Sequence, residues 1–187
     1  MELDVLKSRV KAILNEEGED IALELSDDTV MLGDYIDRAL PDAVAMLSTE
    51  GKAVNPKSAS VSADNKGVIS LPPDFISLVE IMATSWGRAL SSTTPVNSPV
   101  YRRAMNPRTA PAKYSPICYR KGGNSLVALP VGSITSFVYN AALGTDFLGD
   151  EVAATAVCYM AAALVMSYFE NEAAAQRLKN IAISYNQ

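Results

Sequence analysis

Apolar residues at helical spacing mark the beginning of the chain. Leucine, valine and isoleucine recur every three or four positions over residues 1–17, which predicts an amphipathic α-helix. A run of capping residues at 26–28 predicts the start of a second helix. Pro41 is expected to interrupt that helix, because proline has no backbone N–H to donate to the preceding turn, and to restart a further helix that Gly51 ends.

The end of the chain returns to the helical pattern. Residues 151–170 are mostly apolar and rich in alanine, with Asp150 as a predicted N-cap. Asn171 is placed to cap a last helix over residues 173–183. The apolar run inside the first of these helices is 15 residues long, which is shorter than the roughly 20 that a bilayer span requires. We therefore expect a buried or interfacial helix that is not a membrane anchor, and no membrane among the partners.

Between the helical ends, the pattern changes to short runs rich in β-branched and aromatic residues. Pro72 and Pro73 cannot donate hydrogen bonds to a ladder and predict a corner between two strands. Turn residues at 64–67 and 121–124 predict hairpins. We expect one antiparallel sheet. Its predicted strands are residues 58–62, 67–71, 78–89, 116–120, 125–129 and 134–143.

Residues 91–115 fit neither pattern. They are rich in Ser, Thr, Pro and Asn without periodicity, which predicts a long loop. A compact domain seldom keeps such a loop unless it is functional or becomes ordered against a neighbour. The predicted fold is α+β: a helical bundle from the N- and C-terminal helices, packed on an antiparallel β-sheet with this long central loop. We expect a single domain over residues 1–187, helical in 1–51 and 146–187 and β in 58–145.

Charge is distributed unevenly along the chain. The net charge is −5, yet no Asp or Glu occurs between residues 81 and 145. The seven cations of that segment give it a charge of +7, which leaves −12 on the two flanks together. These cations are Arg88, Arg102, Arg103, Arg108, Lys113, Arg120 and Lys121. An acidic chain with a basic centre is not typical of a protein that binds nucleic acid over its whole surface.

The composition removes much of the usual catalytic chemistry. The chain contains no histidine, which excludes Ser-His-Asp and Cys-His arrangements, histidine-ligated zinc and the commonest general base. We expect no enzymatic activity and no cofactor or metal. Cys118 and Cys158 are predicted to be free buried thiols, and they are the named candidates if the chain is instead an enzyme with an unfamiliar nucleophile. The acidic start of the sequence, unlike a signal peptide, favours a reducing cytosol.

The basic centre has two interpretations. Tyr101, Tyr114 and Tyr119 lie among its cations, so the segment 88–121 is a candidate for contact with nucleic acid. The alternative is that identical subunits associate head to tail, with the basic face of one copy against an acidic face of the next. Such heterologous contacts can close into rings. We favour this second interpretation.

A longer pattern carries a resemblance to a known family. Leu71-Pro72-Pro73-Asp74-Phe75-Ile76-Ser77-Leu78-Val79 is followed by Trp86 and Arg88, and then by Ser98-Pro99-Val100-Tyr101-Arg102-Arg103 with Asn106. With Asp34-Tyr35-Ile36-Asp37-Arg38-Ala39-Leu40-Pro41 before it and the Ala-rich helices after it, this order of elements resembles the head-tail connector proteins, or portal adaptors, of tailed bacteriophages.

The resemblance implies a structural protein of the virion, assembled in the host cytoplasm and located at the head-tail junction. It implies a dodecameric ring that links the portal to tail or further ring proteins around a channel. Genomic DNA would pass through that channel on ejection without being recognised by sequence. Trp86 is expected to be mainly a core anchor. The candidate residues for subunit or partner contacts are Trp86, Arg88, Tyr101, Arg102, Arg103, Arg108, Ile181, Ile183 and Tyr185.

Overall fold

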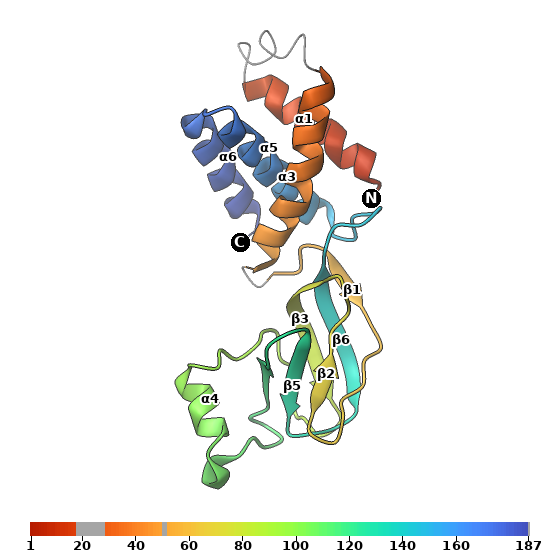
Figure 1. Ribbon diagram of the computed structural model, residues 1–187, viewed down its shortest axis with the longest axis vertical. Helices are drawn as coiled ribbons and strands as arrows, with labels where there is room; N and C mark the ends of the chain where they lie inside the picture. Colours follow the sequence, from red (N-terminus) through yellow and green to blue (C-terminus); the bar gives the residue numbers. More distant parts are fainter. Residues whose placement is uncertain (18–28, 50–51, 187) are drawn as a thin grey trace. The chain divides into compact units, whose positions relative to one another are not determined.

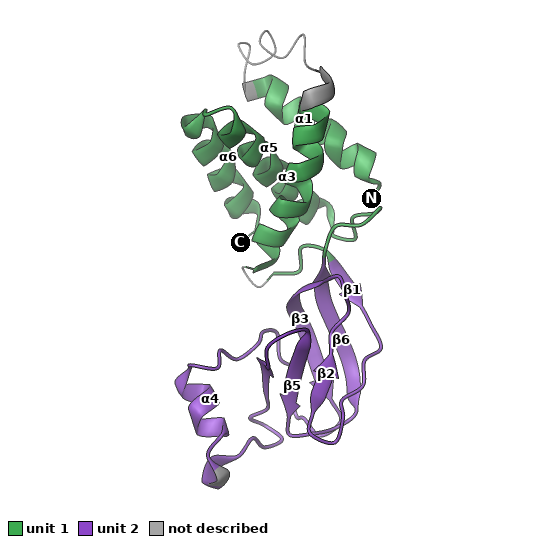
Figure 2. Ribbon diagram, in the orientation of Figure 1, with its two compact units in different colours: residues 1–55, 142–187 green, residues 56–141 purple. Residues whose placement is uncertain are grey.

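The computed structural model describes residues 1–17, 29–49 and 52–186. The chain forms two compact units (Figure 2). Unit 1 combines Met1–Asn55 with Ala142–Gln187, and unit 2 is Pro56–Ala141. The predicted α+β class is confirmed, because unit 1 holds helices from both ends of the chain and unit 2 holds antiparallel strands.

One apolar helix forms the centre of unit 1. The helices described there are α1 (Leu3–Glu17), α3 (Thr29–Thr49), α5 (Glu151–Tyr168) and α6 (Glu172–Tyr185), labelled in Figure 1. Each of α1, α3 and α6 packs against α5. By length and composition α5 is apolar enough to cross a membrane, but 61% of it is buried inside the protein. Small alanine side chains on α5 let the neighbouring helices approach it closely.

The two predicted caps of the C-terminal helices are confirmed. The Asp150 carboxylate accepts a hydrogen bond from the backbone N–H of Ala153 at 2.8 Å. The Asn171 side-chain oxygen accepts one from the N–H of Ala174 at 3.2 Å. Both bonds satisfy a backbone donor that has no partner inside the helix.

The predicted break at Pro41 is wrong, because α3 continues through it. Ile36, Leu40, Val44 and Leu47 are all fully buried, and their spacing places them on one stripe that runs along both halves of the helix. Pro41 is exposed, so its ring meets solvent and the helix loses one backbone hydrogen bond there. Burial of the continuous stripe outweighs that loss. The predicted cap at 26–28 and the stop at Gly51 lie outside the described residues.

Unit 2 contains two antiparallel three-stranded sheets instead of the one sheet that we predicted. The first sheet has the order β1 (Pro56–Ser58), β6 (Ile134–Ala141) and β3 (Phe75–Ala83). The second has the order β2 (Val68–Ser70), β5 (Ser125–Leu129) and β4 (Ile117–Arg120). The proline corner carries the chain from β2 in one sheet to β3 in the other. Two sheets allow each to bury one apolar face against its partner.

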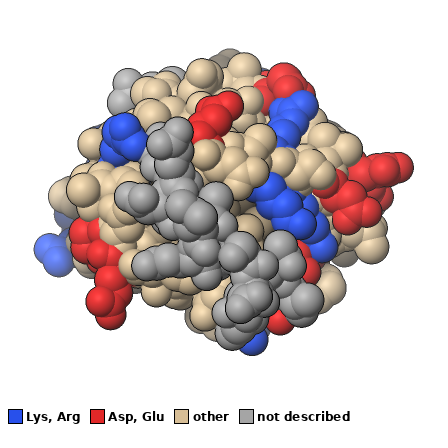
Figure 3. All heavy atoms as spheres, turned by 90° about the horizontal axis from the view of Figure 1, so that it is seen from above, with Lys and Arg blue, Asp and Glu red and all other residues tan. Residues whose placement is uncertain are grey.

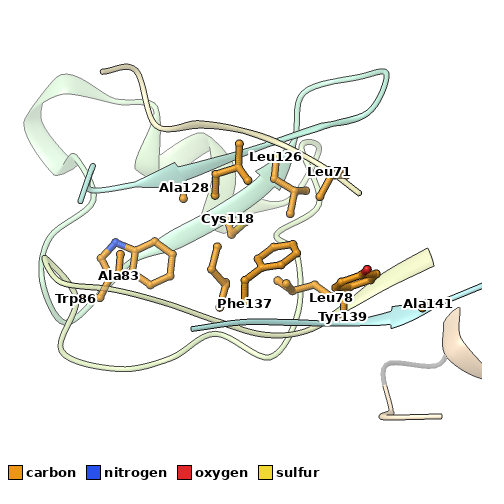
Figure 4. Packing of buried hydrophobic residues seen from close by; sticks show 12 residues of the cluster. Leu71, Leu78, Ala83, Trp86, Cys118, Leu126, Ala128, Phe137, Tyr139 and Ala141 are labelled. Carbon is orange, nitrogen blue, oxygen red and sulfur yellow. The ribbon is translucent and has the colours of Figure 1, made fainter. Parts of the chain in front are cut away.

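The core of unit 2 lies between these sheets (Figure 4). Leu126 and Ala128 of one sheet face Leu78 and Phe137 of the other. Trp86, which is 3% exposed, closes one end, where its indole N–H donates to the carbonyl of Pro130 at 2.8 Å. Trp86 reaches this position because the chain turns after β3. The strand predicted over residues 78–89 is therefore too long, since β3 ends at Ala83.

A glycine turn joins the segment before β2 to that strand. The Asp64 carboxylate accepts hydrogen bonds from the backbone N–H groups of Lys66 and Val68, both at 2.8 Å. The bond from Val68, ahead of the one from Lys66, holds the pKa of Asp64 below its usual value. Gly67 has φ +77°, which favours glycine. The predicted turn is present and carries a single antiparallel bridge between Ala63 and Ile69. The predicted hairpin is wrong, because the preceding strand is Pro56–Ser58 instead of 58–62 and pairs with β6.

An aspartate after the proline corner ties three parts of unit 2 together. The Asp74 carboxylate contacts the ammonium of Lys57 on β1 at 2.7 Å and accepts a hydrogen bond from the Tyr139 hydroxyl on β6 at 2.8 Å. The Lys57 ammonium, with a smaller effect of the Tyr139 hydroxyl, holds the pKa of Asp74 below its ordinary value. The Pro-Pro-Asp-Phe motif is therefore a structural corner in this protein.

Candidate interface surfaces

The largest departure from the sheets of unit 2 is the segment of residues 91–115, which we call the arm. It was expected to be a loop without structure, but it contains the helix α4 (Pro99–Ala104) and the short 3-10 helix η1 (Pro107–Thr109). The Ser98 hydroxyl accepts a hydrogen bond from the N–H of Tyr101 at 3.1 Å and caps α4. The pair Ser98-Pro99 is a helix-start signal that the sequence contains, although hydrophobic periodicity does not reveal it. Figure 1 shows the arm projecting to one side of the sheets.

Backbone hydrogen bonds hold the base of the arm. The Gly87 N–H donates to the carbonyl of Lys113 at 2.7 Å, and the Thr94 N–H donates to that of Cys118 at 2.6 Å. A Cβ atom on Gly87 would lie 2.5 Å from the Tyr114 ring, so glycine allows the arm to close against the residues after β3. The arm is therefore anchored at both ends.

The cations of the arm have no acidic partners within it. Arg102, Arg103 and Arg108 are exposed, and no ion pair that we find in residues 1–17, 29–49 and 52–186 involves an arm cation. Lys113 lies over the Tyr114 ring, with 5.5 Å between the ammonium and the ring centroid. By contrast, acidic and basic side chains lie close to one another on the face of the molecule in Figure 3. The arm presents positive charge that is available to a partner.

Apolar side chains are also exposed on the arm. Val100 is 59% exposed and Tyr114 75% exposed, and α4 buries none of its residues. Between α4 and the segment 109–117 lies a hollow of about 330 Å³, lined in part by Val100, Arg103 and Ile117. We call it the arm hollow. An apolar hollow with a cation on its lining suits an apolar side chain that lies next to a carboxylate.

The predicted interface residues fall into three places. Trp86 lies in the core of unit 2, as its indole suggested, while Arg88 is exposed beside the base of the arm. Tyr101, Arg102, Arg103 and Arg108 all belong to the arm, where Tyr101 is half-buried and packs edge-on against Tyr119 at 4.9 Å between ring centroids. The third place is in unit 1.

That third place is the end of α6. Ile181 and Ile183 are half-buried there, and Tyr185 is 46% exposed. The Tyr185 ring stacks on Tyr159 of α5, with 6.0 Å between the centroids and 7° between the planes. The end of α6 therefore offers a partly apolar surface that α5 supports.

Unit 1 carries a second exposed apolar surface, which sequence reasoning missed. It consists of Leu148, Val152 and Val5, which are 49%, 53% and 41% exposed, with the exposed carboxylates of Glu2 and Asp146. We call these five residues the Leu148 surface. Met1 and Phe147 exchange two backbone hydrogen bonds of 2.7 and 2.9 Å, which hold the start of the chain against the turn before α5. In the sequence this surface is marked only by Leu148 and Val152 among acidic residues, which does not indicate an exposed apolar surface.

A family model places this arrangement among known proteins. The model of the SU10 adaptor protein matches residues 1–184. The chain belongs to the SU10 adaptor protein family. This makes it a phage structural adaptor and a component of the virion, which contacts other virion proteins. The adaptor part of the predicted resemblance is thus confirmed. No curated protein matches the chain.

The two cysteines of this SU10 adaptor protein are buried free thiols, as predicted. Burial raises the pKa of Cys118 to about 12 and that of Cys158 to about 11. Because the thiolate is the nucleophile, both side chains are poorly suited to covalent catalysis. In the described part of the chain, no group of three or more Cys, Asp or Glu side chains is arranged to hold a metal ion.

Proposed function

We propose that this SU10 adaptor protein forms a ring of identical copies at the head-tail junction, dodecameric as the resemblance implies. The ring would bridge the portal to tail or further ring proteins, and genomic DNA would pass through its channel without sequence recognition. The observation that carries this proposal is the family match over residues 1–184. Formation of an interface is then the activity of the protein, and no catalytic step is required.

The distribution of charge supports association between copies. The arm holds exposed cations that form no ion pair with the acidic residues of the described chain, whereas the segments on either side of residues 81–145 carry a charge of −12. A basic surface on one copy that meets an acidic surface on the next is a heterologous contact, which can close into a ring. Opposite charges also speed the encounter and select the orientation.

The test is assembly on the portal. The purified chain is mixed with the portal protein of the same phage and examined by negative-stain electron microscopy and sedimentation velocity. We expect rings bound to the portal. We expect Arg102→Glu combined with Arg103→Glu to stop ring closure, while circular dichroism shows that the monomer remains folded.

A matched variant separates position from net charge. Lys66→Glu with Lys121→Glu makes the same change in charge on exposed turns of unit 2 and should leave assembly intact. Rings of unchanged size from the Arg102 and Arg103 variant would contradict the role of the arm. A wild-type chain that never associates with the portal or with itself would overturn the proposed function.

A second candidate function is binding of nucleic acid by the segment 88–121. Tyr114, which is 75% exposed with Lys113 beside its ring, favours it. Tyr101 does not, because its ring is occupied by Tyr119. The discriminating experiment is a titration with duplex DNA at several salt concentrations, since phosphate contacts give an affinity that falls steeply with salt. Strong binding at low salt, without assembly on the portal, would favour this second function.

A further inference from the structure

We propose that the arm hollow of one copy receives the Leu148 surface of a second copy of this chain. This pairing rests on the proposed function, because it requires that copies associate, and it adds which two surfaces meet. Leu148 and Val152 would enter the hollow, while Glu2 and Asp146 would lie against the arginines of α4.

Within the described residues, α4 is packed mainly through Tyr101, whose ring lies against Tyr119. This helix has six residues, none of them buried, and a helix of that length is marginal in water without tertiary packing. Val100, which is 59% exposed, and Arg103 both line the hollow, so its lining is apolar with a cation beside it. Packing against an apolar surface with carboxylates at its edge would supply the missing contacts.

The backbone of the Leu148 surface is held rigidly around Leu148. The side-chain oxygen of Asn55, a residue that is 1% exposed, accepts a hydrogen bond from the backbone N–H of Leu148 at 2.7 Å. A Cβ atom on Gly149 would lie 2.1 Å from the carbonyl oxygen of Val54, so only glycine allows the turn to close this tightly. Leu148 is therefore an exposed apolar side chain on a fixed backbone, which lowers the entropy lost on binding.

The carboxylates of this surface lie in an unfavourable position in the isolated chain. Glu2 and Asp146 are direct partners in an antiparallel bridge, so their side chains leave the backbone on the same side, and like charges placed opposite one another are destabilising. The neighbouring Glu151 already pairs with Arg9. A guanidinium from another molecule would relieve the repulsion between Glu2 and Asp146.

Charge also identifies a second copy of this chain as the occupant. Two arms would bring cations together, and two Leu148 surfaces would bring carboxylates together. The complementary arrangement is an arm against a Leu148 surface, and every copy carries one of each. The same pair of surfaces can therefore repeat from copy to copy around a ring.

Cross-linking of introduced cysteines tests the pairing directly. A chain that carries both Val100→Cys and Leu148→Cys is assembled on the portal and treated with a short bis-maleimide. The native thiols are buried and should not interfere. We expect a ladder of cross-linked copies on a denaturing gel. Val131→Cys with Leu148→Cys is the matched control, because Val131 is 43% exposed in unit 2 but lies outside the arm, and it should give no ladder.

The possible results separate this pairing from the proposed function. Rings that form without a Val100–Leu148 ladder would overturn the pairing and leave the ring intact. A cross-link within one chain, or one to the portal protein, would assign a different occupant to the arm hollow and overturn the pairing as well. Absence of rings from the wild-type chain would overturn both.

Charge reversal provides a second readout. We expect Arg103→Glu alone, and Glu2→Lys with Asp146→Lys alone, each to lower the yield of rings about tenfold, the effect of losing one close ion pair. A chain that carries all three substitutions should recover part of the yield, because the charges at Arg103 and at both carboxylates are then reversed, while Arg102 keeps its charge. Circular dichroism verifies that each variant is folded. No recovery in the triple variant, or unchanged rings in the partial variants, would contradict the pairing.

Discussion

Replacing Asp74 by asparagine tests how unit 2 is held together at its proline corner. The carboxylate accepts a hydrogen bond of 2.8 Å from the hydroxyl of Tyr139, a residue that is 1% exposed. It also pairs with the exposed Lys57 ammonium at 2.7 Å. Asparagine keeps the size of the side chain and one acceptor oxygen, but it removes the negative charge.

The structure sets the expected size of the effect. A hydrogen bond to a charged group contributes about 1.5–3 kcal/mol and a neutral one about 0.5–1.5 kcal/mol, so weakening the bond from Tyr139 should lower the free energy of unfolding by about 1 kcal/mol. The ion pair with Lys57 adds little, because it is solvated. Asp74→Ala should cost more, about 2–3 kcal/mol, since the Tyr139 hydroxyl then loses its acceptor.

The effect should depend on pH in a defined direction. Its neighbours hold the pKa of Asp74 below its ordinary value in the folded protein. The carboxylate therefore contributes stability above the unfolded pKa of about 3.9, and this contribution is lost as pH falls through the lower folded pKa. The difference in stability between wild type and Asp74→Asn should be constant from about pH 7 to pH 5 and shrink below about pH 4.

Trp86 provides the assay. It is the only tryptophan of the chain and lies in the core of unit 2, so its fluorescence during urea titration reports the unfolding of that unit. In a Tyr139→Phe background, Asp74→Asn should have little further effect, because the main bond is already absent. Equal stability of wild type and Asp74→Asn at pH 7, or a difference that persists undiminished at pH 3, would refute this account of the corner.

Three further results are expected. Gly67→Ala should lower the free energy of unfolding of unit 2 in urea titrations by at least about 2 kcal/mol, because the added Cβ would lie 2.4 Å from a carbonyl oxygen. Gly122 has a similar φ of +75° but open space around it, so Gly122→Ala should lower the free energy of unfolding by only about 1 kcal/mol. Both cysteines should resist Ellman's reagent at pH 8 in native protein and react in urea, since burial raises the pKa of each. Asn55→Ala should leave the Leu148 N–H without that acceptor and lower the melting temperature by several degrees.

Helices with local signals were predictable from the sequence. The caps Asp150 and Asn171 each act on a residue three positions away, so their meaning is contained in a short window. Pro41 was misjudged for the opposite reason. Its local cost is one hydrogen bond, whereas the gain from the stripe that includes Leu40 and Val44 depends on packing against α5, which a local pattern does not contain.

The pairing of strands was less predictable. Strands β1 and β2 have three residues each, too few for alternation to indicate a buried face. The proline corner indicates that the chain turns between β2 and β3, but not that β3 leaves the sheet to pair with β6. That choice depends on which faces are buried against one another, and the paired residues are 51–66 positions apart in the sequence.

The two candidate surfaces differ in the same way. The arm is one continuous segment, so its cations could be identified by counting charges along the chain. The Leu148 surface forms only when Met1 and Phe147, 146 residues apart, exchange hydrogen bonds. Its apolar residues are ordinary helix and turn residues in the sequence, and their exposure becomes evident only in the folded unit.

The two surfaces together restrict the symmetry of any assembly that they build. An isologous dimer would place identical surfaces against each other. Repulsion between cations opposes a contact of arm with arm, and repulsion between carboxylates opposes a contact of two Leu148 surfaces. A contact between unlike surfaces leaves one of each free at the ends of every open chain of copies, so association continues until the ends meet. Because each contact is modest on its own, closure is favoured only when a template holds many copies at high local concentration. We therefore expect the isolated protein to be monomeric at low concentration, and ring formation to depend steeply on the presence of the portal.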